Sequence, residues 1–140
     1  MQRSLLEERL DTLDNQLAQK MEQLEEKEKN ICLMYESLIQ NFRIQLQRFE
    51  SLKEEGALKK IFNKHQDTFQ GIMEEIIDFL EVLIKLPYKV LVGKKAYEEM
   101  DELIADLEDW IETINEDLEE VTNSKFAYIE AWDIGVFFEH

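Results

Sequence analysis

The sequence contains few of the residues that end or bend regular structure, with four glycines and one proline in 140 residues. A β-sandwich or barrel needs a turn about every ten residues, and its turns draw heavily on glycine and proline. Their scarcity excludes these architectures. Leucine, isoleucine, glutamate and lysine dominate instead, which predicts an all-α fold of single-domain size.

The sequence has a single cysteine, and its first residues do not resemble a secretion signal. The single cysteine, Cys32, cannot form an intrachain disulfide, and its apolar helical surroundings predict a small buried hydrophobe. The first residues become charged before any apolar run develops, unlike a signal peptide. Both features lead us to expect a cytoplasmic protein.

The chain also lacks a hydrophobic run long enough to span a membrane. The most apolar stretch, residues 76–92, is shorter than the roughly 20 apolar residues a spanning helix needs. Five polar or breaking residues interrupt it: Asp78, Glu81, Lys85, Pro87 and Lys89. We therefore expect a buried helix and no membrane partner.

Positive charge is almost absent from one end of the chain. The net charge is −16, and residues 97–140 contain fifteen acidic side chains and a single lysine. Direct binding to nucleic acid needs lysine and arginine to displace counterions from phosphates, so this segment argues against it. The imbalance favours a protein partner with a basic surface.

An unbroken apolar heptad runs through this acidic segment. Its members alternate at steps of three and four residues: Tyr97, Met100, Ile104, Leu107, Ile111, Ile114, Leu118 and Val121. Leu103 and Trp110 widen the stripe, as in a helix that packs inside a bundle. The pattern predicts an acidic helix over residues 95–121 that is apolar on one side and negative on the other.

A second apolar stripe runs from Leu6 to Leu52 without glycine or proline, and predicts one long helix. Up to residue 29 the stripe is as narrow as a coiled-coil seam, so residues 1–29 are predicted to form a dimerising arm. The strands of that dimer could be parallel or antiparallel. The predicted dimer contacts are Leu6, Leu10, Leu13, Leu17, Met21 and Leu24. The polar residues 25–30 leave open a break in this helix, with Asn30 as its N-cap.

Residues 30–140 are predicted to form an antiparallel bundle of three to four helices. The stripe broadens after Asn30, Gly56 ends the first helix, and a second runs over residues 57–86 until Pro87. Residues 87–95 form the connection to the acidic helix. The long N-terminal coiled-coil helix thus leads directly into the bundle.

An aromatic tail follows the acidic helix and allows two interpretations. Its helical spacing, seen for example in Phe126, Ile129 and Trp132, favours a short helix over a strand. The tail could close the end of the bundle, or Trp132 and Phe137 could anchor a partner, since aromatic residues are frequent at binding hot spots.

Catalytic and metal-binding patterns are missing. Gly93-Lys94-Lys95 lacks the upstream glycine and the hydroxyl of a nucleotide-binding loop. Phenylalanine stands three residues before both His65 and His140, where a di-metal bundle would place glutamate. We therefore expect no enzyme, no metal and no cofactor, with His65 as a core or boundary residue.

The acidic helix places like charges four residues apart, as in Glu112 and Glu116, which repel each other. A purely solvated face would more simply alternate glutamate with lysine, so recognition of a basic surface competes with solvation as the explanation. The predicted partner contacts are Glu98, Glu102, Asp106, Glu108, Asp109, Glu112, Glu116, Glu120, Trp132 and Phe137.

The functional prediction is a non-enzymatic interaction or adaptor protein that dimerises through its coiled coil and presents the acidic face to a basic protein. The alternative is an inhibitor that places carboxylates where a nucleic acid has phosphates, as small acidic anti-defence proteins of phages do. That alternative rests on length and composition alone.

Overall fold

The computed structural model describes residues 4–54, 56–123, 134–135 and 138. The described residues form α-helices and two short 3₁₀ turns, η1 (Glu26–Glu28) and η2 (Leu52–Glu54), and include no strand. The predicted all-α bundle is therefore confirmed. The α-helices are α1 (Leu5–Gln23), α2 (Lys29–Ser51), α3 (Leu58–Leu83), α4 (Tyr88–Leu91) and α5 (Lys94–Thr122).

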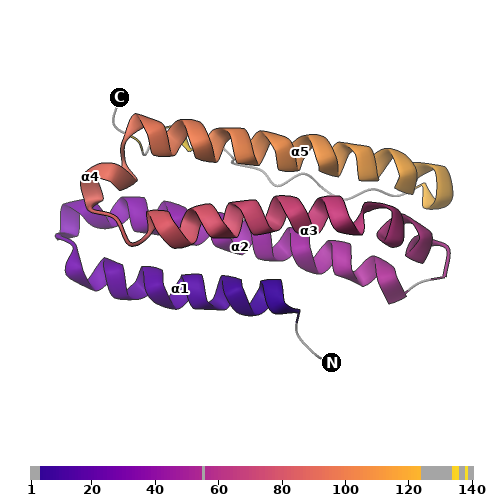
Figure 1. Cartoon of the computed structure of the whole chain (residues 1–140), viewed down its shortest axis with the longest axis horizontal. Coiled ribbons are helices and arrows are strands. Elements are labelled where there is room, and N and C mark those ends of the chain that lie inside the picture. The colour runs from indigo at the N-terminus through magenta and orange to yellow at the C-terminus, as the bar shows by residue number, and fades with distance from the viewer. Residues whose placement is uncertain (1–3, 55, 124–133, 136–137, 139–140) are drawn as a thin grey trace.

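The four long helices lie side by side along the long axis of the molecule, with the one-turn helix α4 at one end (Figure 1). Each long helix runs antiparallel to the next in the chain, so α1 and α3 are parallel. Arg9 near the start of α1 binds Asp78 and Glu81 in the second half of α3. The shorter α1 therefore covers only the second half of α3.

The first helix differs from its prediction, because the chain turns back at Leu24 and Glu25. Both residues have extended backbone, with ψ of 153° and 154°. A capping box follows, in which the Glu25 N–H donates to Glu28 Oε1 at 3.2 Å. The helix is thus broken, as the alternative for residues 25–30 allowed, although Glu25 and not Asn30 caps the new turn.

The turn makes residues 5–23 a member of the bundle and not a projecting arm. Burial of their leucine stripe against the rest of the chain drives this packing. The exposed fractions of the predicted dimer leucines are 7% for Leu6, 0% for Leu10 and Leu13 and 2% for Leu17, and Met21 and Leu24 are partly buried against the same core. In this chain the predicted dimer seam is therefore covered internally.

The polar face of α1 is also tied to its neighbours. Arg43 of α2 lies 2.7 Å from carboxylate oxygens of both Asp11 and Asp14. The Lys20 ammonium group donates to the carbonyl of Leu86, just beyond α3. These bonds fix the register of α1 against both helices.

The remaining helices follow their predicted bounds closely. The acidic helix α5 begins one residue before and ends one residue after its predicted range, and Asn123 closes it in the left-handed conformation, with φ of 58°. Gly93 precedes α5 in a tight turn, where a Cβ would lie 3.3 Å from the Val90 carbonyl oxygen. The predicted connection contains the additional helix α4.

The core is apolar along its length and contains a cluster of aromatic rings where α2 ends and α3 begins. The Phe49 ring lies between those of Phe62 and Phe69, with centroid distances of 4.8 and 4.3 Å, and Trp110 of α5 packs against Phe49 at 5.3 Å. No helix in the described part of the chain combines the length and hydrophobicity needed to cross a bilayer.

Part of the aromatic tail contributes to this core. Phe138 is 5% exposed, and its ring contacts Tyr35 of α2 at 6.2 Å and Tyr97 of α5 at 5.4 Å between centroids. Phe138 therefore closes the bundle, as one interpretation of the tail predicted. Trp132 and Phe137, the predicted partner anchors, lie outside the described residues.

Candidate functional site

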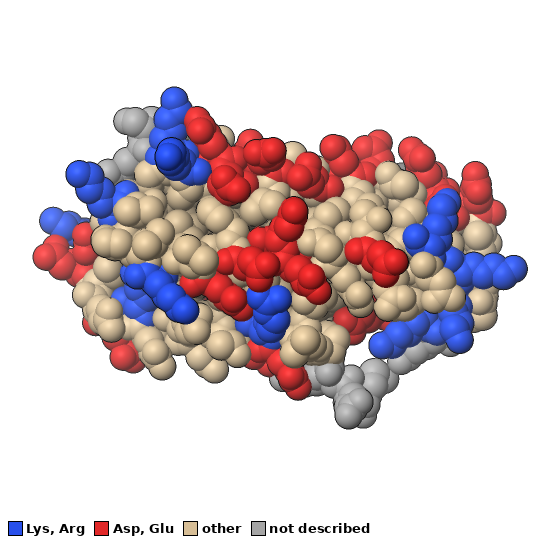
Figure 2. Space-filling view, in the orientation of Figure 1, with Lys and Arg blue, Asp and Glu red and all other residues tan. Residues whose placement is uncertain are grey.

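The outer face of α5 is the predicted partner surface, and the structure exposes it. Six of the eight heptad members, from Met100 to Leu118, are buried, Tyr97 is half-buried and Val121 is exposed, so most carboxylates between the buried members point to solvent. Figure 2 shows acidic side chains along α5 and across the middle of the molecule, with most basic groups towards its two ends and a basic group also in the lower middle. Glu108 is half-buried. The other seven predicted contacts on α5 are exposed: Glu98, Glu102, Asp106, Asp109, Glu112, Glu116 and Glu120.

Few cations approach this face. Lys64 of α3 lies 3.1 Å from Asp117, and Lys94 in the first turn of α5 lies 3.7 Å from Glu98. The predicted contacts Glu102 to Glu120 on α5 lie beyond 4 Å of every lysine and arginine nitrogen in the described part of the chain. The basic residues at the two ends therefore leave the middle of the acidic face uncompensated.

A groove between α3 and α5 concentrates this charge. Its floor is apolar and is formed by Phe79 of α3 and Leu103 of α5. Phe79 is half-buried, and Leu103 is buried with 9% of its surface exposed. Carboxylates form both walls: Glu75 and Asp78 from α3, and Glu99, Glu102 and Asp106 from α5. The site is therefore an acidic groove with a hydrophobic floor, open to solvent.

Among the described residues, only one groove carboxylate has a cation nearby. Asp78 Oδ1 lies 2.6 Å from a guanidinium nitrogen of Arg9, which also holds Glu81 at 3.0 Å. Within the described chain, no other groove carboxylate has a basic nitrogen within 4 Å. The walls thus present four uncompensated negative charges to whatever enters.

The structure divides the predicted contacts between separate surfaces. Glu102 and Asp106 line the groove, whereas Glu112, Glu116 and Glu120 continue along the outer face of α5. Glu108 differs from both groups, because partial burial, together with Asp109 and Asp101, raises the pKa of its carboxyl.

Sequence reasoning missed Glu75, Asp78, Phe79 and Glu99. The spacing of Glu99, Glu102 and Asp106, at steps of three and four, could have indicated one acidic wall. The opposite wall depends on the register between α3 and α5, which no local pattern reveals.

The residues considered for chemistry have structural surroundings. His65 Nε2 lies 2.6 Å from Asp117 Oδ2, and His65 is 6% exposed, as expected of a boundary histidine. Burial raises the pKa of the Cys32 thiol, which makes it a poor nucleophile. Among the described residues, no group of three histidine, cysteine, aspartate or glutamate side chains is placed to hold a metal ion.

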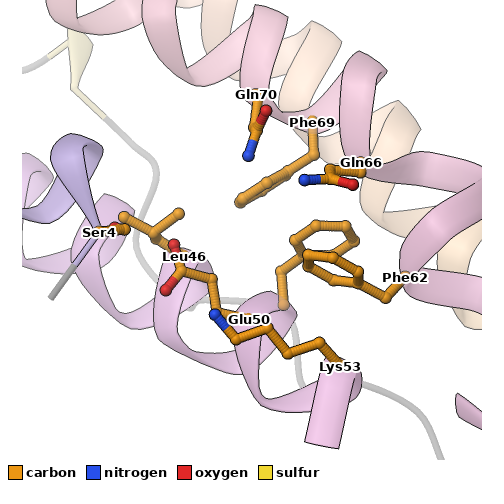
Figure 3. A pocket seen from close by; sticks show the side chains of 9 residues that line it. Ser4, Leu46, Glu50, Lys53, Phe62, Gln66, Phe69 and Gln70 are labelled. Carbon is orange, nitrogen blue, oxygen red and sulfur yellow. The ribbon is translucent and has the colours of Figure 1, made fainter. Parts of the chain in front are cut away.

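A second hollow lies beside the start of α1, between α2 and α3 (Figure 3). Phe49, Phe62 and Phe69 form its base, and Glu50 and Lys53 stand on its rim with opposite charges. It opens where α1 begins and no longer covers the α2–α3 pair. Its rim has no excess of either charge, so the acidic groove is the stronger candidate.

Comparison with known proteins adds no assignment: no family model matches the chain, and searches of curated proteins and of solved structures find no match.

Proposed function

We propose that this protein is a non-enzymatic interaction protein that binds a basic segment of a partner protein in the acidic groove between α3 and α5. The observation that supports this function is the two carboxylate walls on either side of Phe79 and Leu103, in which Asp78 alone has a basic nitrogen within 4 Å among the described residues. A segment with an apolar stripe flanked by lysine or arginine matches both the floor and the walls.

Electrostatics supports this assignment. Like charges at helical spacing of four residues destabilise a helix by about 0.2–0.5 kcal/mol per pair. A bound basic segment would remove that repulsion and gain attraction to both walls. The negative field would also speed the encounter with a basic partner and make it sensitive to salt. A cytoplasmic setting is part of the proposal, because the lone Cys32 has no second cysteine in the sequence.

A nucleic-acid mimic is the second candidate. The uncompensated row continues past the groove through Glu112, Glu116 and Glu120, which lie about 6 Å apart along the helix axis at four-residue spacing. A short basic peptide bound in the groove would not contact these residues, because they do not line it. A nucleic-acid-binding surface could follow the whole row.

Two matched triple variants distinguish these functions, since each removes three negative charges. The groove variant is Glu75→Gln, Glu99→Gln and Asp106→Asn, and the row variant is Glu112→Gln, Glu116→Gln and Glu120→Gln. Binding is measured by calorimetry with a synthetic amphipathic helix carrying lysines on both sides of a leucine stripe. A scrambled peptide of the same composition is the control.

The groove proposal predicts that the groove variant weakens binding of the amphipathic peptide by about tenfold or more, while the row variant changes it less than threefold. Equal loss in both variants, or equal binding of the scrambled peptide, contradicts it. The mimic is favoured instead if a DNA-binding enzyme binds the wild type but not the row variant, and if duplex DNA displaces it.

A further inference from the structure

The turn between α1 and α2 stands at an unusual place in the sequence. Residues 24–28 read Leu-Glu-Glu-Lys-Glu, all good helix formers, and the sequence has no glycine or proline before Gly56. The apolar stripe of α1 also continues into α2 through Leu24 and Ile31. Local preference for a continuous helix therefore conflicts with the observed turn, so a continuous helix competes with the turn at these residues.

The contacts of α1 do not depend on this turn. Leu10 and Leu13 are fully buried against the bundle, Arg43 holds Asp11 and Asp14, and Arg9 holds Glu81. All of these bonds join α1 to α2 or α3 across helix faces. An identical α1 from a second chain could form every one of them.

We propose that the chain forms a domain-swapped dimer, in which residues 24–28 become helical and α1 of each chain packs on α2 and α3 of the other. The two continuous α1–α2 helices would then lie antiparallel, because α1 and α2 are antiparallel within one chain. A two-fold axis near the turn relates them and closes the assembly. The stripe from Leu6 to Leu24 becomes the dimer seam, and this inference is independent of the proposed groove function.

The conformation of residues 24–28 determines the equilibrium between monomer and dimer. The closed turn is held by the Glu25–Glu28 capping box and by a backbone bond, which the Glu28 N–H donates to the Glu25 carbonyl at 2.9 Å. In the dimer, the continuous helix gains hydrogen bonds across residues 24–28, but each chain loses translational and rotational entropy on association. Nearly all other contacts are the same, so the dimer fraction should rise with protein concentration.

Two variants should shift this balance in opposite directions. Glu26→Pro suits the closed turn, because Glu26 is the first residue of η1 and the preceding Glu25 already has extended backbone, with ψ of 154°. Proline inside a continuous helix would break it. The double variant Glu25→Ala and Glu28→Ala removes the capping box and introduces the strongest helix former.

Light scattering across a concentration series tests the shift, with circular dichroism to confirm that each variant keeps its helix content. We expect Glu26→Pro to stay monomeric, the wild type to dimerise as concentration rises, and the alanine variant to dimerise at about tenfold lower concentration. A wild type and an alanine variant that both remain monomeric throughout would overturn the proposal.

Cross-linking shows which chain supplies α1. One chain carries Arg9→Cys and another, of different mass, carries Glu81→Cys, both with Cys32→Ala. After the two are unfolded and refolded together, a short bismaleimide should join them into a heterodimer, because residues 9 and 81 are adjacent across α1 and α3. A dimer that forms without this cross-link is held together in another way and refutes the swap.

Discussion

His65 donates from Nε2 to Asp117 Oδ2 at 2.6 Å and so joins the first half of α3 to the last turns of α5. Lys64 adds a second bond to the same oxygen at 3.1 Å, and the Trp110 ring packs against the imidazole. The hydrogen bond from His65, followed by that from Lys64, holds the pKa of Asp117 below its ordinary value. Asp117 is thus a structural carboxylate, unlike Glu116 and Glu120, which have no basic nitrogen within 4 Å among the described residues.

Replacing Asp117 with asparagine should destabilise the fold at neutral pH by about 1 kcal/mol, because a partly exposed charged hydrogen bond contributes less than a buried one. The difference between wild type and variant should persist down to the ordinary aspartate pKa of 3.8 and then disappear as the pH falls through the lower pKa of the folded state. Urea unfolding from pH 7 to pH 2 measures it.

Asp67→Asn provides the control for this measurement. Asp67 is exposed on α3 and has no basic nitrogen within 4 Å among the described residues. Its replacement should change the free energy of unfolding by less than about 0.5 kcal/mol at any pH. Similar losses for the two variants would show that His65 and Lys64 do not distinguish Asp117 from other carboxylates.

The helices with strong periodicity could be predicted well from the sequence. The eight-member apolar heptad defined α5 to within one residue at each end, because nothing in that segment favours a break. A break within residues 25–30 was one alternative, but the sequence could not decide for the α1–α2 turn, since residues 24–28 all favour helix and the turn is set by burial of Leu10 and Leu13 against the bundle. Tertiary packing overrode local preference there.

The candidate site was predictable only in part for a similar reason. The carboxylates on α5, including Glu102 and Asp106, follow directly from the helical pattern. The facing wall depends on α3 lying antiparallel to α5 with Phe79 beside Leu103, which is a relationship between residues far apart in the sequence. A helical pattern states which side of a helix is polar but does not identify its neighbour.

Neutralising Glu112 should stabilise the bundle. Glu108 and Glu116 lie four residues on either side, and none of the described lysines or arginines approaches Glu112 within 4 Å. Glu112→Gln removes two repulsive pairs and should raise the free energy of unfolding by about 0.4–1 kcal/mol at low salt. At 1 M salt, where the screening length is about 3 Å, most of that gain should be lost. Thermal unfolding at the two salt concentrations measures both effects.

Glu98→Gln is the matched comparison, because Glu98 has an attractive partner as well as a repulsive one. Its carboxylate lies 3.7 Å from Lys94 and four residues before Glu102. The two effects oppose each other, so this variant should show little gain. A gain from Glu112→Gln that persists at high salt would contradict the electrostatic explanation.

Removing the Tyr35 hydroxyl should loosen the end of the bundle that holds α4. Tyr35 is fully buried, and its hydroxyl donates to the Leu91 carbonyl at 3.1 Å. Tyr35→Phe keeps the ring contact with Phe138 but leaves that carbonyl without this donor, at a cost of about 1–2 kcal/mol. Urea unfolding measures the loss, and hydrogen exchange should show faster exchange at the Val92 amide, which closes α4.

The same variant has a distinct dependence on alkaline pH. Burial raises the pKa of Tyr35 above its ordinary value of 10.0, so the neutral phenol is favoured in the folded state. The contribution of the Tyr35 hydroxyl to the free energy of unfolding is complete below pH 10.0. It declines as the pH rises further, because Tyr35 ionises in the unfolded chain at a lower pH than in the folded protein. The stability difference between wild type and Tyr35→Phe should therefore narrow above pH 10.0. A difference that stays constant up to pH 11.5, under conditions where both proteins still fold reversibly, would show that Tyr35 is not held neutral by burial.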